Sequence, residues 1–226
     1  MDFRSAWCFS WGLSCAALLA APAAAQSGAA AGQGGVDLLA DASCVLQVGD
    51  VALGTLAPGQ PQKLSLAAGA HEVVCTSTEW TGVAARERIS LQAGQTQALR
   101  LRLRWTAAPD GVLDRAQRLV WTRQDNGADI DMSAAAAWCT SLGAGWRLPS
   151  RAELESLVAG AAGETTPCRG VQCRAPALFA LSGYWMWSGE RNAAGRIWYV
   201  YLHTGHTQAS APDYKLNARA LCVRPA

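Results

Sequence analysis

The segment from Gly145 to Leu154, Gly-Trp-Arg-Leu-Pro-Ser-Arg-Ala-Glu-Leu, constrains the fold of this chain more than any other feature. Residues 132–142 before it are rich in alanine, and Gly143 favours the left-handed backbone that ends many helices. Ser150 and Glu153 have the spacing of a capping box, so we expect a second helix to begin there. The sequence therefore predicts two helices joined by a tight turn.

The polar residues of this turn are expected to be structural. The Ser150 hydroxyl and the Glu153 carboxylate are committed to the helix cap. Pro149 restricts the backbone just before the helix, beside Trp146. Arg147 is predicted to donate hydrogen bonds to carbonyl groups inside the turn.

The first 25 residues have the features of a secretory signal peptide. Arg4 gives a positive start, residues 11–21 are apolar, and Ala23-Ala24-Ala25 has the small-residue pattern of a cleavage site. A lipoprotein anchored at Cys15 is an alternative, although the preceding leucine stands one position late for that signal. We expect a periplasmic or secreted protein with no transmembrane segment after cleavage.

Six of the eight cysteines follow this signal, and an even number in an exported chain predicts disulfides. Two of the six lie on predicted strands of the N-terminal part. Two more are separated by four residues, and the last two join the first helix to the final strand. Of the 15 pairings that six cysteines allow, we predict Cys44–Cys75, Cys168–Cys173 and Cys139–Cys222.

The N-terminal half predicts an all-β domain. Residues 26–40 are small and polar, so we expect a flexible linker there. Residues 41–104 contain short segments of alternating hydrophobicity with turns between them, which predicts a small antiparallel sandwich. Residues 105–109 are predicted to be a second linker.

Residues 41–104 resemble the PEGA domain in the order of their parts. These parts are a Gly-Asp turn, Leu53-Gly54-Thr55, a Leu-x-Leu-x-x-Gly-x-His turn and a final Leu-x-Ala-Gly-Gln-Thr segment. The usual Pro-Gly-Glu-Gly-Ala stretch is missing, and a cysteine pair is present instead. The resemblance implies an immunoglobulin-like sandwich that acts as a spacer or a binding scaffold in the bacterial envelope.

Residues 110–226 predict an α+β domain in which two helices precede a sheet. Their motifs resemble the Lcl C-terminal domain family of bacterial proteins. The resemblance implies a C-type-lectin-like fold of unknown function. The motifs are Leu119-Val120-Trp121, Ala137-Trp138-Cys139, the Gly145–Leu154 segment, Tyr184-Trp185-x-Trp187-Ser188, Trp198-Tyr199-Val200 and Cys222-Val223-Arg224.

Several function classes are disfavoured by the residues. The net charge is +2 and both signs are scattered, so no basic stripe suits nucleic acid. The C-type-lectin-like fold is also used by formylglycine-generating enzymes, but each mature cysteine has a predicted disulfide partner, so we expect no enzyme. Asp213 and Asn217 alone are too few ligands for calcium. We expect no cofactor and no metal, and calcium stays open as an alternative without further support.

The candidate ligand-binding residues lie on a late hairpin. If Trp198, Val200 and Leu202 face the core, alternation directs the intervening side chains outward, near two arginines of the preceding loop. Such side chains suit a sugar ring, a sulfate or a partner protein. The candidates are Arg191, Arg196, Tyr199, Tyr201, His203 and His206.

The sequence thus predicts a non-catalytic binding protein of the bacterial cell envelope that recognises a glycan or an envelope component. A protein–protein module, such as an inhibitor or an immunity factor against a periplasmic effector, is the alternative. An enzyme of the formylglycine-generating type is the third possibility.

Overall fold

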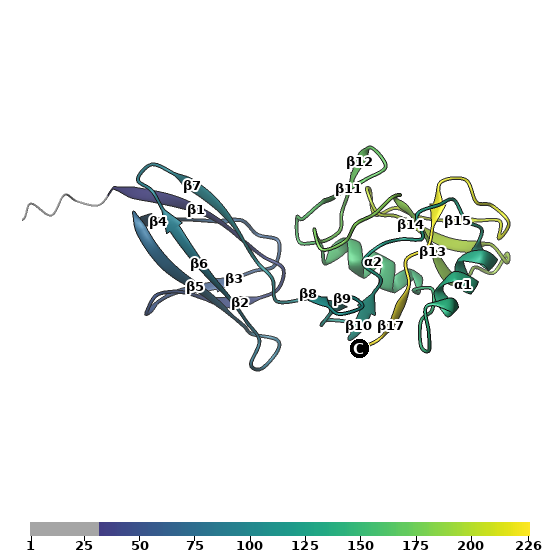
Figure 1. Ribbon diagram of the computed structural model, residues 1–226, viewed down its shortest axis with the longest axis horizontal. Coiled ribbons are helices and arrows are strands. Elements are labelled where there is room, and N and C mark those ends of the chain that lie inside the picture. Colours follow the sequence, from purple (N-terminus) through teal and green to yellow (C-terminus); the bar gives the residue numbers. More distant parts are fainter. Residues whose placement is uncertain (1–31) are drawn as a thin grey trace, which may run out of the picture. The chain divides into compact units, whose positions relative to one another are not determined.

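The structure is a computed structural model, and it describes residues 32–226. The predicted signal peptide (residues 1–25), Cys15 and the first part of the predicted linker lie outside these residues. The described chain is mostly β, with two short helices and several small sheets (Figure 1). Within residues 32–226, no helix has the length and apolar character needed to cross a bilayer.

The N-terminal half contains two sheets. One has the strand order β4-β1-β7 and the other β3-β2-β5-β6. Two sheets agree with the predicted sandwich, but the prediction that it is antiparallel is wrong for β1 and β7, which pair parallel. The Cys44–Cys75 disulfide lies in its buried core, as predicted. The strands are β1 (Gln33–Ala40), β2 (Cys44–Val48), β3 (Val51–Leu56), β4 (Gln62–Ala67), β5 (Gly69–Ser77), β6 (Ala84–Leu91) and β7 (Thr96–Leu101).

Strand β1 corrects the prediction of a flexible linker for residues 33–40; residues 26–31 lie outside the described part of the chain. It pairs antiparallel with β4 and parallel with β7. Val36 and Leu38 are each only 1% exposed and pack in the sandwich core. The glycines before them suit a strand here, because a Cβ on Gly34 would lie 2.8 Å from the carbonyl oxygen of Gln92. Composition alone indicated a linker, whereas close backbone packing needs the same small residues.

Asp41 secures the end of this parallel pair. Its carboxylate accepts hydrogen bonds from the backbone N–H groups of Leu103 (2.6 Å), Arg104 (3.0 Å) and Trp105 (3.0 Å). Burial outweighs these bonds and raises the pKa of Asp41 above its usual value. One side chain therefore satisfies three donors where β7 ends.

The prediction of a linker at residues 105–109 is wrong for β8 (Trp105–Ala108). This strand belongs to a sheet of order β17-β10-β9-β8, with β9 (Gly111–Asp114), β10 (Leu119–Trp121) and β17 (Val223–Pro225). Trp105 is 1% exposed, and its Nε1 donates to the Gly160 carbonyl oxygen at 2.7 Å. Burial of this large side chain explains why the segment is ordered.

The two predicted helices are present. Helix α1 (Met132–Ser141) is capped by the Asp131 side chain, which accepts from the backbone N–H of Ala134. Helix α2 (Arg151–Ala159) begins with the predicted capping box at Ser150. The second sheet of this half has the order β15-β14-β13-β16 and follows the helices in the chain, in agreement with the predicted α+β class.

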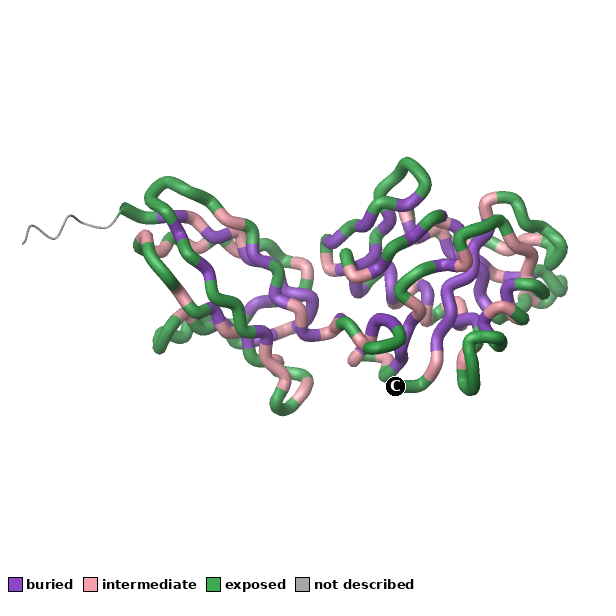
Figure 2. The backbone as a smooth tube through the Cα atoms, viewed as in Figure 1, coloured by how far each residue is buried: buried purple, intermediate pink, exposed green. Residues whose placement is uncertain are grey.

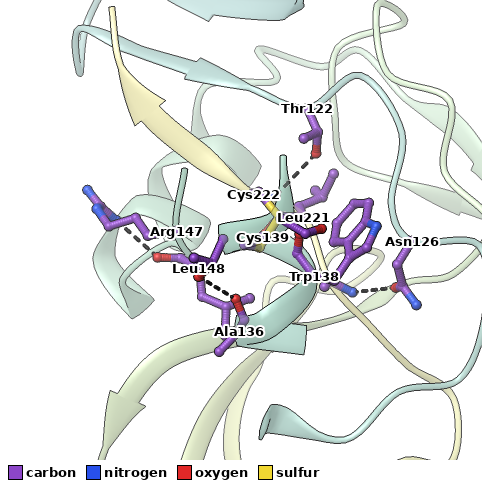
Figure 3. The surroundings of a disulfide bond; sticks show 12 residues. Thr122, Asn126, Ala136, Trp138, Cys139, Arg147, Leu148, Leu221 and Cys222 are labelled. Atoms are coloured by element: carbon purple, nitrogen blue, oxygen red, sulfur yellow. Dashed lines mark hydrogen bonds between the residues drawn. A yellow bond between two sulfur atoms is a disulfide. The ribbon is translucent and has the colours of Figure 1, made fainter. Parts of the chain in front are cut away.

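The other two disulfides also match the predicted pairs. Cys168–Cys173 joins the hairpin of β11 (Thr166–Cys168) and β12 (Val171–Cys173). Cys139–Cys222 ties helix α1 to the segment before β17 (Figure 3). The backbone N–H of Cys222 donates to Thr122 Oγ1 at 3.2 Å, so the end of the chain is also hydrogen-bonded to the segment after β10.

The late sheet consists of β13 (Trp185–Arg191), β14 (Ile197–Tyr201), β15 (Thr207–Ser210) and β16 (Ala218–Arg219). One hydrophobic cluster includes Val200 and Leu202, and a second includes Trp187 and Tyr199. Alternating residues of β14 therefore contribute to two different cores. Buried residues are frequent in β1, β13 and β14, whereas β3 and many connecting loops are exposed (Figure 2).

Candidate functional site

The Gly145–Leu154 segment is held by its own polar residues. Ser150 Oγ accepts from the Glu153 N–H at 3.0 Å, and the Glu153 carboxylate accepts from the Ser150 N–H at 2.6 Å. Arg147 donates to the Leu148 carbonyl at 3.1 Å, as predicted, but it also donates twice to Glu153, at 2.7 and 2.8 Å. The Arg147 hydrogen bonds hold the pKa of Glu153 below its usual value. The polar groups of the turn are thus used in its own structure.

Aromatic side chains gather on one face of the late sheet instead. We call this set the aromatic row, and it includes all four tyrosines of the sequence. Its members come from the segment before β13, from β13 and β14, from the turn after β14 and from the loop of residues 211–217. They are Tyr184, Trp185, Tyr199, Tyr201, His203 and Tyr214.

The register of the strands brings the central members together. Trp185 and Tyr201 are directly opposite each other on β13 and β14, and their ring centroids are 5.5 Å apart. The Trp185 ring lies 4.1 Å from that of Tyr199 and 4.8 Å from that of Tyr214, on which it stacks. Tyr184 meets His203 edge to face at 4.6 Å. The row is therefore continuous from Tyr214 to His203.

The expected outward orientation of Tyr199 is wrong. Tyr199 is 4% exposed, because Trp185 and Trp187 of the neighbouring strand pack against it. Its hydroxyl donates to Gln208 Oε1 at 2.8 Å, and burial is the main cause that raises its pKa. Tyr201 and His203 on the same face are half-buried and do reach the surface. Alternation alone could not distinguish a face that is open from one covered by a second core.

The two predicted arginines lie at the other end of the hairpin. Arg191 pairs with Ile197 beside the connecting loop, whereas Tyr201 pairs with Trp185 at the far end. The exposed Arg191 donates to the Gly195 carbonyl at 3.0 Å, and the exposed Arg196 donates to that of Ala209 at 3.1 Å. They flank the row near Tyr199 and do not join its surface members.

His206 lies in the turn between β14 and β15. Its side chain is exposed, and its carbonyl oxygen accepts from the N–H of Tyr201 at 2.8 Å. In the part of the chain that the structure describes, no three His, Cys, Asp or Glu side chains gather as metal ligands. Asn217 has φ +64° and donates its backbone N–H to Asp129. It therefore has a local structural role.

Sequence reasoning missed three members of the row as site residues. Tyr184 and Trp185 belong to the Tyr-Trp-Met-Trp motif, which served to identify the family and not a site. Tyr214 lies in an irregular loop without periodicity. The available signal was compositional, because all four tyrosines fall between residues 184 and 214.

Two buried polar atoms of the row have no partner among residues 32–226. They are Nε1 of Trp185 and Nδ1 of His203. Buried donors and acceptors are usually paired, so these two nitrogen atoms are exceptions. The row therefore offers flat apolar rings, tyrosine hydroxyls and two free nitrogen atoms. This chemistry suits recognition of a ligand by stacking and neutral hydrogen bonds.

Comparison with known families places the C-terminal half. The model of the Lcl C-terminal domain matches residues 110–224, which is 115 of the 226 residues of the chain. The chain belongs to the Lcl C-terminal domain family. The Lcl domain contains both helices, the Gly145–Leu154 segment and every member of the aromatic row, whereas β8 lies just before it.

Curated protein sequences and solved structures give no close relative of the whole chain. No curated protein sequence matches the chain. Among solved structures, the adhesin InvE of Yersinia pseudotuberculosis is 14% identical, with a TM-score of 0.27. The match covers 79% of this chain and 55% of the adhesin chain. This TM-score is too low to indicate a shared overall fold.

Proposed function

We propose that this protein is an exported, non-catalytic binding protein of the bacterial cell envelope. Its Lcl domain recognises a glycan or another envelope component at the aromatic row. The observation that carries the proposal is the gathering of three tyrosine rings (Tyr199, Tyr201 and Tyr214) around Trp185. The fourth tyrosine, Tyr184, packs on Tyr201 and His203, and these three side chains are half-buried, while Tyr214 is exposed. Tyrosine presents a large apolar surface and a hydroxyl with little loss of side-chain entropy on binding.

The disulfides support a location outside the cytoplasm. Three bridges in residues 32–226 are typical of oxidising compartments. With the signal-like first 25 residues, they favour export to the periplasm or beyond. The two-sheet N-terminal half is compatible with a PEGA-like scaffold that carries the Lcl domain, and we propose this role for it.

A binding role is favoured over catalysis by the state of the thiols. Each cysteine within residues 32–226 is in a disulfide, so the described chain offers no thiolate nucleophile for chemistry of the formylglycine-generating type. A protein partner is the second candidate. It is favoured by the exposed apolar side chains of Tyr214 and Leu216, which are 36% and 59% exposed.

Glycan binding can be tested with the full chain, produced with its own leader in a bacterial host. The purified protein is screened against neutral oligosaccharides and sulfated polysaccharides, and binding is quantified by calorimetry. Tyr201→Ala should weaken binding at least about tenfold, because truncating an aromatic anchor typically costs more than about 1.4 kcal/mol.

Trp80→Ala is the matched control, since Trp80 is a half-buried aromatic residue of the N-terminal half. Near-ultraviolet circular dichroism confirms that both variants are folded. If the protein binds no glycan and instead recovers one stoichiometric protein from envelope extract, the glycan proposal is wrong. The protein–protein alternative then replaces it.

A further inference from the structure

Tyr214 occupies the stacking face of Trp185. Their rings are 4.8 Å apart with an interplanar angle of 28°. Trp185 is only 6% exposed, whereas Tyr214 is 36% exposed. The other ring neighbours of Trp185 (Tyr199, Tyr201 and Trp187) come from β13 and β14 and are fixed by the strand ladder. Among these ring contacts of Trp185, the one that comes from outside the sheet is therefore the contact with Tyr214.

The loop that carries Tyr214 is lightly held. Every residue from Ala211 to Leu216 is exposed. Two of its backbone bonds are local turns, from Tyr214 N–H to the Ala211 carbonyl and from Ala218 N–H to the Lys215 carbonyl, each at 3.1 Å. A third joins the Met132 N–H to the Pro212 carbonyl at 3.1 Å. Segments with few buried contacts open at low free-energy cost, so the loop can move while the sheet stays intact.

The closed arrangement leaves a polar atom unsatisfied. Within the described chain, Nε1 of Trp185 is buried without an acceptor. A buried donor without a partner opposes closure, while the stacked rings favour it. Opening the loop would free the face of the indole ring, and a ligand that enters there could bring an acceptor for Nε1. Ring stacking thus favours the closed state of the Tyr214 loop and the unpaired Nε1 opposes it, as expected of an element that has a closed and an open state.

The ligand must fill the space that the Tyr214 ring leaves. It must present a flat apolar face to the indole ring of Trp185 and an oxygen atom at its edge to accept a hydrogen bond from Nε1. A pyranose ring with equatorial hydroxyl groups has both, because its axial C–H groups form a flat face and its oxygens lie around the rim.

The charges near the row favour a neutral sugar. Arg219, the buried arginine of β16, is paired with Asp129, which Arg169 also contacts at 3.3 Å. Arg191 and Arg196 lie at the opposite end of the hairpin. Tyr201 and Tyr184 offer hydroxyl groups, and His203 offers an unpaired Nδ1. Arg174 donates to the Thr204 carbonyl oxygen beside His203 at 3.4 Å, and Lys215 follows Tyr214 in the chain. Within residues 32–226, the arginine side chains that lie over tryptophan rings lie over Trp105, Trp146 and Trp198, and none lies over Trp185. A sulfate at Trp185 would therefore find little compensation.

We propose that the Trp185 face binds one neutral pyranose unit with equatorial hydroxyls, and that Tyr214 is a lid which this sugar ring displaces. This inference rests on the proposed glycan function and names the ligand class and the gate of the same site. It makes Tyr214 a competitor of the ligand for the indole face, so removing the tyrosine ring should strengthen binding.

The lid is tested first without ligand, by hydrogen exchange of the indole N–H groups of the full chain, followed by NMR. Trp185→Phe assigns the resonance. We expect Tyr214→Ala to accelerate exchange of the Trp185 N–H at least about tenfold. Leu216→Ala changes a more exposed residue of the same loop and should leave the rate within twofold. An unchanged rate in Tyr214→Ala overturns the lid.

The ligand class is tested with chitotetraose as the neutral probe and heparin as the sulfated probe, both by calorimetry. Chitotetraose should bind, and Tyr214→Ala should lower its Kd about five- to tenfold. Weaker binding in Tyr214→Ala overturns the lid, since Tyr214 would then be a ligand contact.

Binding of heparin without chitotetraose overturns the neutral class, while glycan recognition stands. If neither probe binds, and no glycan in the wider screen binds either, the proposed glycan function itself is wrong. The exchange measurement still decides the lid in that case, so the two failures are distinguishable.

Discussion

Removing the disulfides one at a time should destabilise the protein in the order of the loops that they close. A disulfide restricts the unfolded chain, and in the chain-entropy model its effect grows with the logarithm of loop length. The separations are 83 residues for Cys139–Cys222, 31 for Cys44–Cys75 and 5 for Cys168–Cys173. The model then gives losses of about 4.6, 3.7 and 2.1 kcal/mol on replacing each pair by alanine.

The comparison within the Lcl domain is the sharpest. The constant of the model cancels between Cys139–Cys222 and Cys168–Cys173, which leaves a difference of about 2.5 kcal/mol. All four cysteines are at most 1% exposed, so the loss of buried sulfur is similar in both double variants. Both pairs belong to the same domain, which avoids comparing separate unfolding transitions.

Urea unfolding followed by tryptophan fluorescence measures the difference. For a domain of this size the midpoints of the two alanine double variants should differ by about 1–2 M. Near-ultraviolet circular dichroism shows whether each variant is folded before denaturant is added. The loop-length reasoning fails if loss of Cys168–Cys173 destabilises the domain as much as loss of Cys139–Cys222. Non-reducing peptide mapping that links Cys139 to Cys168 would refute the pairing itself.

Three further changes test the scaffold by urea unfolding. Asp41→Ala leaves three backbone N–H groups without their acceptor and should cost roughly 3–5 kcal/mol, whereas Asp41→Asn keeps an acceptor oxygen and should cost less. Ser150→Ala removes the helix cap and should cost about 1 kcal/mol; a loss near zero would contradict the cap. Glu153→Gln should be less stable than the wild type at pH 7, and the gap should close as the pH falls below about 4.5. The pKa of Glu153 is lowered in the fold by Arg147, so its stabilisation is fully present above the usual pKa and is lost as the pH falls through the lowered pKa; a gap that does not narrow at all below pH 4.5 would contradict this.

Local signals in the sequence were sufficient for the two helices of the Lcl domain. The spacing of Ser150 and Glu153 predicts the start of α2, because a capping box involves only four consecutive residues. The disulfide pairs followed from the number and position of the cysteines. By contrast, β1 and β8 were predicted as linkers. These segments form ordered strands because of contacts with residues that are distant in sequence. Examples are the pairing of β1 with β7 and the hydrogen bond from Trp105 to Gly160.

The aromatic row shows the same limit at the level of the site. Alternation along β14 groups Tyr199 with Tyr201 and His203, and the structure does place all three on one face. Alternation cannot tell which of them another element covers, and Tyr199 is covered while Tyr201 is not. Tyr214 comes from a loop without any period, yet it makes the stacked contact with Trp185. A strand thus determines which side chains can share a surface, and a loop determines which of them a ligand can reach. For this reason a single loop substitution, Tyr214→Ala, is expected to alter recognition without altering the sheet beneath it.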